Sequence, residues 1–297
     1  MTASATRLSV FTRLAYNQGS MAPELRVMTF NIRTSTARDL RFAWDLRKHL
    51  VIERIRHFDP DLLGLQECQD GEQRMFIEQQ LPDYGFLGVR RGEDNRIGRE
   101  MAPLMYRKSA FDLLDSGFFW LSRQPSVPGS KLFGAVFPRA VAWARLRPLD
   151  SVAAELFFFN THFDYMPLIL AASARVLREQ IWLITGGAPA IVVGDFNTPA
   201  GGTAYGVLSE PFVETNGRFA LVDTMEGHRR SGIRLPGTIH KFGRINRPII
   251  IDWILASQQF VVLESNVDDY DDNGLYPSDH FPVTAVLSPK LSGQATS

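Results

Sequence analysis

Short runs of β-branched and aromatic residues recur along the chain, and each run is bounded by turn-forming residues. This pattern is typical of β-strands. We predict strands at eight positions, which are 25–30, 62–65, 103–106, 140–146, 156–160, 190–193, 249–255 and 282–287.

Apolar residues at helical spacing mark two further segments. One apolar face runs through 44–58 and ends before Pro60, and a second runs through 170–184 and ends before Gly186. A shorter helix is predicted at 72–81. Many strands with a few helices between them favour a layered α/β protein, with one sheet packed on another and the helices outside.

The domain is expected to cover residues 22–290. Residues 1–21 are predicted to form a loose extension, in which Met21 is an alternative start, and 291–297 are predicted to form a polar tail. No internal repeat or low-complexity linker divides the chain.

Polar side chains stand where several predicted strands begin or end. A carboxylate beside an apolar strand is costly unless it is paired or bound to a metal. Each case alone is compatible with a turn or a helix cap, but a single site at one rim of a sheet explains all of them together. These residues are Asn31, Glu67, His162, Asp195, Asn197, Asp252, Asp279 and His280.

The chemistry of these residues favours phosphate-ester hydrolysis with a metal. Oxygen ligands such as Asn31, Glu67 and Asp279 suit a hard cation such as Mg²⁺. The neighbouring His162 and His280 suit contact with phosphate oxygens. The sequence has no Cys/His cluster for zinc, no Walker loop and no nucleophile elbow around a serine.

Charge and composition narrow the range of partners. Lys plus Arg and Asp plus Glu each total 32, so the formal net charge is zero, and tight binding of long nucleic acid without sequence preference is not expected. The single Cys68 excludes an internal disulfide and is expected to be a buried, inert thiol. We expect a cytoplasmic protein with no membrane span and no obligate protein partner.

Six short motifs, in this order, carry a resemblance to a known family. They are "MTFNIR", "LQE", "NTHFD", "GDFN", "IDWIL" and "SDHFP", within residues 25–287. Together they resemble the endonuclease/exonuclease/phosphatase superfamily, which shares the fold of deoxyribonuclease I. The resemblance implies an α/β fold, a four-layer α-β-β-α sandwich of two mostly antiparallel sheets flanked by helices.

The resemblance also implies a site for Mg²⁺ or Mn²⁺. Glu67 would be the main ligand, with Asn31 beside the metal directly or through water. Asp279 would complete the network of metal and water.

The same resemblance assigns the catalytic roles. His162 would contact the scissile phosphate, and Asp195 would orient or deprotonate the attacking water. Asn197 would hold Asp195 and a phosphate oxygen. His280 would bind the phosphate, with Asp252 holding its imidazole.

One position departs from the pattern of some DNA-repair members. They carry an acidic residue two positions after the first-motif asparagine, where this chain has Arg33. The chain is more similar to an uncharacterised bacterial branch, so an abasic-site nuclease is disfavoured. Tyr106, Arg107, Arg139 and His240 are candidate substrate-binding residues. The alternatives are a solvated surface charge for Arg139 and an ordinary strand residue for Tyr106.

We therefore predict a Mg²⁺- or Mn²⁺-dependent phosphoesterase whose substrate is a small phosphodiester or a nucleotide-like molecule. The alternative activity is a nuclease acting on DNA or RNA. The alternative of another class is a non-catalytic binding protein that retains the fold, and the intact polar set argues against it. A secreted lipid hydrolase is disfavoured because paired cysteines and an apolar hairpin are absent from the sequence.

Overall fold

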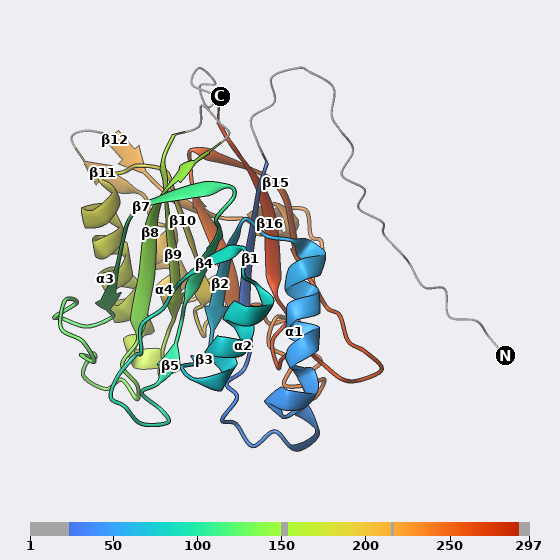
Figure 1. Ribbon diagram of the computed structural model, residues 1–297. Helices are drawn as coiled ribbons and strands as arrows, with labels where there is room; N and C mark the ends of the chain where they lie inside the picture. Colours follow the sequence, from blue (N-terminus) through green and yellow to red (C-terminus); the bar gives the residue numbers. More distant parts are fainter. Residues whose placement is uncertain (1–23, 150–153, 215–216, 291–297) are drawn as a thin grey trace.

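The computed structural model describes residues 24–149, 154–214 and 217–290. The predicted extension at 1–21 and the predicted tail at 291–297 lie outside these ranges. The described residues form two stacked six-stranded sheets with helices on their outer faces (Figure 1).

The first sheet has the strand order β15-β16-β1-β2-β6-β4. The strand β16 lies between β15 and β1, so two strands from late in the chain complete the sheet beside β1. The bounds are β1 (Leu25–Asn31), β2 (Leu62–Gln66), β4 (Tyr84–Leu87), β6 (Leu104–Arg107), β15 (Phe260–Val267) and β16 (Val283–Pro289).

The second sheet has the order β13-β14-β10-β9-β8-β7. Its bounds are β7 (Phe111–Trp120), β8 (Ala140–Pro148), β9 (Leu156–His162), β10 (Ala190–Asp195), β13 (Leu221–Asp223) and β14 (Asp252–Ser257). Two small ribbons pair β3 (Cys68–Gln69) with β5 (Glu100–Met101), and β11 (Phe212–Glu214) with β12 (Gly217–Phe219).

Alternation along the strands creates the layers. In β1, Val27 packs between the sheets, whereas Met28 faces the core beneath α1 (Trp44–Phe58) and α2 (Glu72–Gln80). In β9, Phe158 packs between the sheets, whereas Phe159 faces the core beneath α3 (Pro167–Thr185). Successive side chains of a strand point to opposite faces, so each buried strand serves two cores. The predicted four-layer α-β-β-α fold is confirmed.

The remaining helices are short. They are η1 (Leu40–Phe42), α4 (Thr203–Ser209) and α5 (Glu226–Arg230). In the described part of the chain, no helix is long and apolar enough to cross a membrane. Cys68 is buried as predicted, and burial raises the pKa of its thiol.

One strand prediction is wrong at its start. The apolar run 249–255 was expected to be a strand throughout, but β14 begins only at Asp252. The Thr238 hydroxyl accepts hydrogen bonds from the backbone N–H groups of Ile251 and Asp252, at 3.0 and 3.3 Å. These backbone groups therefore bond to a side chain of a neighbouring loop at the point where the strand begins.

A buried pair of amides joins the two sheets. Gln66 Nε2 donates to Asn160 Oδ1 at 2.7 Å, and Asn160 Nδ2 donates to the Leu65 and Pro103 carbonyls, each at 2.7 Å. Gly64 of β2 makes room for this bridge. A Cβ atom there would lie 2.3 Å from Val193 Cγ2 and 2.7 Å from Asn160 Oδ1.

We predict that Gly64→Ala lowers the free energy of unfolding by about 1–3 kcal/mol, the usual cost of overpacking a core. The measurement is urea-induced unfolding followed by circular dichroism. Gly206→Ala is the matched control, because Gly206 lies within α4 and a Cβ there meets no atom within 4 Å. It is expected to be neutral or stabilising, by up to about 1 kcal/mol. Equal effects of the two substitutions would contradict the close approach at Gly64.

Candidate active site

The polar residues singled out in the sequence converge on one rim. Within the described residues, each sheet contains one parallel pair, β1 with β2 and β9 with β10. Asn31 pairs with Gln66 at the end of the first pair, and Glu67 follows immediately. Asp195 pairs with His162 at the end of the second pair. The carboxyl ends of these four strands therefore supply the site.

Asp195 lies at the centre of the site. Its Oδ2 accepts a hydrogen bond from Asn31 Nδ2 at 2.9 Å, and it lies 3.5 Å from His162 Nε2 and 3.9 Å from His280 Nε2. Its Oδ1 accepts the backbone N–H of Asn197 at 2.9 Å. Asp195 is 1% exposed, so these contacts replace water around the carboxylate.

Asp252 and His280 form the predicted pair. Asp252 stands opposite Asp195 in the register of β10 and β14, and its Oδ2 lies 2.9 Å from His280 Nδ1. Burial lowers the pKa of His280, but Asp252 and then Asp195 outweigh it and raise that pKa to about 10. Burial, followed by the charge of Asp252, raises the pKa of Asp195 to about 7. His280 is therefore an imidazolium at neutral pH, next to a carboxylate able to take up a proton.

Asn197 holds Asp195 in a different way from the one expected. The contact comes from its backbone N–H, whereas its side-chain Nδ2 donates to the Phe163 carbonyl at 2.9 Å. Asn197 has a φ of 52°, in the left-handed region that asparagine tolerates better than most residues. The tight turn after β10 thus aims a backbone donor at the carboxylate.

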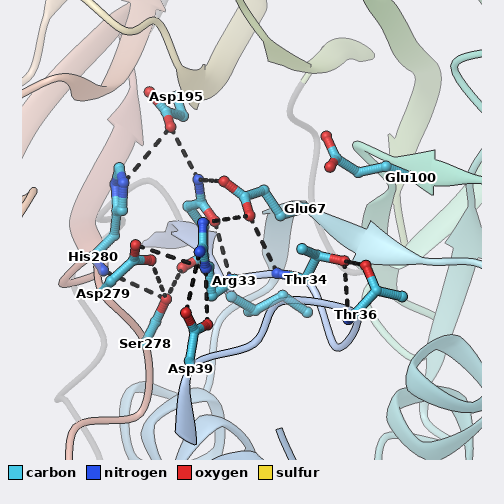
Figure 2. Close-up of polar contacts among 12 residues, drawn as sticks. Arg33, Thr34, Thr36, Asp39, Glu67, Glu100, Asp195, Ser278, Asp279 and His280 are labelled. Carbon is cyan, nitrogen blue, oxygen red and sulfur yellow. Dashed lines mark hydrogen bonds and ion pairs between the residues drawn. The ribbon is translucent and has the colours of Figure 1, made fainter. Parts of the chain in front are cut away.

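The predicted cation ligands gather beside Asp195 (Figure 2). Glu67 Oε1 accepts from Asn31 Nδ2 at 3.2 Å, and Glu67 Oε2 accepts the backbone N–H of Thr34 at 3.2 Å. The Arg33 guanidinium lies 3.7 Å from Glu67 and 3.9 Å from Asp279. Burial raises the pKa of Glu67, but Arg33 and weaker contacts outweigh it, and the net shift is downward. The structure therefore keeps Glu67 ionised.

These residues fit a divalent cation. The carboxylates of Glu67 and Asp279 both turn toward the positive Arg33 guanidinium, and their ligand atoms are all oxygens, as Mg²⁺ and Mn²⁺ prefer. Glu67 has a φ of 57°, a strained conformation of the kind found at functional sites. The amide oxygen of Asn31 accepts the backbone N–H of Arg33 at 3.0 Å, so Asn31 contacts Glu67 through its nitrogen.

A second group of possible ligands consists of Asp195, Asp252 and His280, whose ligand atoms lie within 4.8 Å of one another. His280 uses Nδ1 on Asp252 and is an imidazolium at neutral pH. A protonated imidazole has no lone pair for a metal. With His280 protonated, these three residues fit a cation less well than Glu67 and Asp279 do.

A buried cluster behind His162 was not anticipated. Glu100 Oε1 lies 3.7 Å from His162 Nδ1, 3.2 Å from Arg139, and in contact with Arg91. Burial, and then the charges of Arg139 and Arg91, lower the pKa of His162 well below its usual range. His162 is thus a neutral imidazole beside the charged His280. The signal in the sequence was an acidic residue within the otherwise apolar "EMAPLMY".

The candidate substrate-binding residues divide into two groups. Arg139 is buried beside the site, so its alternative as a solvated surface charge is wrong. Tyr106 pairs with Leu62 at the opposite end of β2 from Glu67, and Arg107 contacts Asp59 there. The prediction for Tyr106 and Arg107 is therefore wrong, because β6 runs antiparallel to β2 and carries its last residues away from the rim.

His240 lies next to the site, but its ring is buried. It stacks on Phe281 with ring centroids 3.8 Å apart, and its Nδ1 accepts the backbone N–H of Gly243 at 3.1 Å. The backbone N–H of His240 donates to the Asp279 carbonyl at 3.0 Å. His240 thus supports the segment that carries Asp279 and His280.

We predict that His280 stays protonated as the pH rises from 6 to 9, because the imidazolium is held between two carboxylates. In Asp252→Asn the strongest of these charges is lost, and His280 is expected to release its proton below pH 9. The measurement is the ring ¹⁵N chemical shift of His280 across a pH titration. Titration near pH 6.5 in the unsubstituted protein would contradict the pair.

Comparisons with known proteins agree with this geometry. The sequence model described as the endonuclease/exonuclease/phosphatase family matches residues 28–280. A mannosyl-6-phosphatase from Bacteroides thetaiotaomicron is 31% identical, with a TM-score of 0.75 over 89% of this chain and 99% of that chain. An endonuclease/exonuclease/phosphatase family protein from the same organism is 30% identical, with a TM-score of 0.78 over 92% and 100%.

Among curated proteins, an uncharacterized protein of Acanthamoeba polyphaga mimivirus is 22% identical over 254 residues, which are 83% of this chain and 92% of that protein. The family model covers residues from Met28 within β1 to His280, and two solved structures of at least 30% identity cover nine-tenths of the chain or close to it. The chain therefore belongs to the endonuclease/exonuclease/phosphatase family, a family of phosphoester hydrolases.

Proposed function

We propose that the protein is a Mg²⁺- or Mn²⁺-dependent phosphoesterase that hydrolyses small phosphorylated molecules. The observation that carries this proposal is the position of Asp195. Its buried carboxylate lies between His162 and His280 and shares the Asn31 amide with Glu67. A carboxylate suited to act as a base, two imidazoles suited to bind phosphate, and oxygen ligands suited to a cation thus lie together, and this supports the proposal.

Glu67 and Asp279 would hold the cation, with Asn31 beside them. A bound Mg²⁺ or Mn²⁺ supplies Lewis-acid stabilisation of the charge on the phosphate oxygens. The Arg33 guanidinium, which is bonded to Asp39 at 3.0 and 3.2 Å, stays beside the same carboxylates and limits the number of negative charges that the site presents.

The chain's own residues perform the proton transfer. Asp195 orients a water molecule and accepts its proton as the water oxygen forms the new bond to phosphorus and the ester bond breaks. A base with a pKa of about 7 is suited to this role at neutral pH. The His280 imidazolium and the His162 N–H stabilise the oxygens of the phosphoryl group.

The substrate is proposed to be a small phosphate ester. The sequence favoured a phosphodiester or nucleotide-like molecule. The 31% identical relative is a mannosyl-6-phosphatase, which supports including sugar phosphate monoesters. A zero net charge supports weak binding of long nucleic acid, so a nuclease stays the second candidate. A substrate screen should therefore contain monoesters, cyclic and linear dinucleotides, DNA and RNA.

We predict that EDTA abolishes hydrolysis and that Mg²⁺ or Mn²⁺ restores it, because the carboxylates of Glu67 and Asp279 need a cation in order to act on a phosphate. Glu67→Gln is expected to weaken Mn²⁺ binding at least tenfold, as measured by titration calorimetry and by the metal concentration that gives half-maximal activity. Glu72→Gln, at an exposed position of α2, is the control. Full turnover by protein that elemental analysis shows to be metal-free would exclude the metal requirement.

We predict that Asp252→Asn lowers kcat/KM by about 10²–10⁴-fold, the range typical of positioned acid–base groups. His280→Ala should cost at least as much, and the double variant should cost little more than His280→Ala, since the two residues act as a unit. The measurement is kcat/KM for all three variants, with circular dichroism as the test of folding. Losses that add independently would show that Asp252 does not act through His280.

A further inference from the structure

A cavity of about 540 Å³ lies beside the proposed cation site. Its walls are two loops, residues 33–39 and 91–100. The cavity includes Arg33 and Glu100, which also border the site, and Figure 2 shows Glu67 between these two residues. A molecule whose phosphate sits at Asp195 and Glu67 therefore has this cavity as neighbouring space for its remaining atoms.

The lining of the cavity is positively charged, although the whole chain is neutral. It contains four arginines and two carboxylates. Arg33 is bonded to Asp39, and Arg91 is bonded to Glu100, so these four charges compensate one another. Within the described ranges, Arg38 and Arg96 have no acidic partner. The cavity thus carries an excess of two positive charges.

The Arg96 loop is fixed against the opposite wall. Gln69 Nε2 donates to the Arg96 carbonyl at 3.0 Å, and the Arg96 guanidinium donates to the Thr36 carbonyl at 3.4 Å. Asn95 Oδ1 accepts the backbone N–H groups of Ile97 and Gly98 at 3.0 and 2.8 Å. The loop backbone is therefore held in place before a ligand arrives, which lowers the entropy cost of binding.

We propose that Arg38 and Arg96 bind a second oxyanion of the substrate, a phosphate or a carboxylate that is separate from the ester being hydrolysed. Planar guanidinium groups suit such oxyanions because they donate two parallel hydrogen bonds. This inference rests on the proposed phosphoesterase function and narrows its substrates to small molecules with two anionic groups. The phosphate monoester of an uncharged sugar would leave both arginines without an anionic partner.

The test compares three sugar derivatives of similar size at constant ionic strength. They are mannose 6-phosphate, 6-phosphogluconate and fructose 1,6-bisphosphate, which carry no second oxyanion, a carboxylate and a phosphate, respectively. We expect kcat/KM to be about tenfold higher for at least one of the two sugars with a second anionic group than for mannose 6-phosphate. This factor is equivalent to one charged hydrogen bond of modest strength. The better of the two identifies which oxyanion the cavity takes.

The double substitution Arg38→Gln with Arg96→Gln is expected to remove that preference. The ratio of kcat/KM for the preferred sugar with two anionic groups to kcat/KM for mannose 6-phosphate should then fall about tenfold. Arg175→Gln is the matched control, because Arg175 is exposed on α3 and does not line the cavity. No preference in the unsubstituted protein, or a ratio unchanged by the double substitution, would overturn the inference.

A second measurement separates the inference from the proposed function. Calorimetry with inorganic pyrophosphate in the presence of EDTA reports binding without turnover. Weaker binding to the double variant than to Arg175→Gln supports the cavity as an oxyanion site, even if none of the esters is hydrolysed. Equal binding to both variants overturns it, even if the protein proves to be an active phosphoesterase.

Discussion

The amide bridge between Gln66 and Asn160 sets the relative position of the two sheets. Both side chains are fully buried, and both amide NH2 groups and the Asn160 oxygen find their hydrogen-bond partners inside the protein. Only a narrow range of separations between the sheets allows these contacts. Glu67 follows Gln66 directly, and His162 lies two residues after Asn160. The distance between the cation side and the phosphate side of the rim is therefore fixed by a contact in the core, and the absence of a side chain at Gly64 permits that contact.

The charged side chains at the rim form two compartments, that is, two separate clusters, one beside β14 and one beside β1. On the side of β14, the His280 imidazolium is shared by two carboxylates, those of Asp195 and Asp252. On the side of β1, the Arg33 guanidinium is shared by three carboxylates, those of Asp39, Glu67 and Asp279. Each compartment thus keeps an excess of negative charge. This excess would stabilise the proposed cation, and the cation in turn would allow an anionic phosphate to enter a rim of carboxylates.

The sequence alone was enough to locate the candidate site residues where strands end in polar residues. Asn31, Glu67, His162, Asp195, Asp252 and His280 could be assigned to one rim because buried carboxylates need partners and the strands run from apolar to polar. The sequence marked Glu100 only as an acidic residue in an apolar run. Its place behind His162 could not be predicted, since that place depends on a two-stranded ribbon pairing β3 with β5, and such long-range pairing leaves no local pattern. Tyr106 and Arg107 were misplaced because a strand's direction within a sheet is not visible in its own residues. The contact of Asn197 with Asp195 could not be predicted for another reason, because it is made by a backbone N–H, which every residue type except proline provides.

The position of β16 between β15 and β1 affects how the protein is made on the ribosome. Residues 25–107 supply four neighbouring strands of the first sheet, but the free side of β1 has no partner until residues 283–289 have left the exit tunnel. Until then β1 is an edge strand with apolar side chains on both faces, which is a template for pairing with other chains. The segment that carries Asp279 and His280 arrives with the strand that covers this edge. A nascent chain therefore gains the last residues of the candidate active site in the same step that covers this edge.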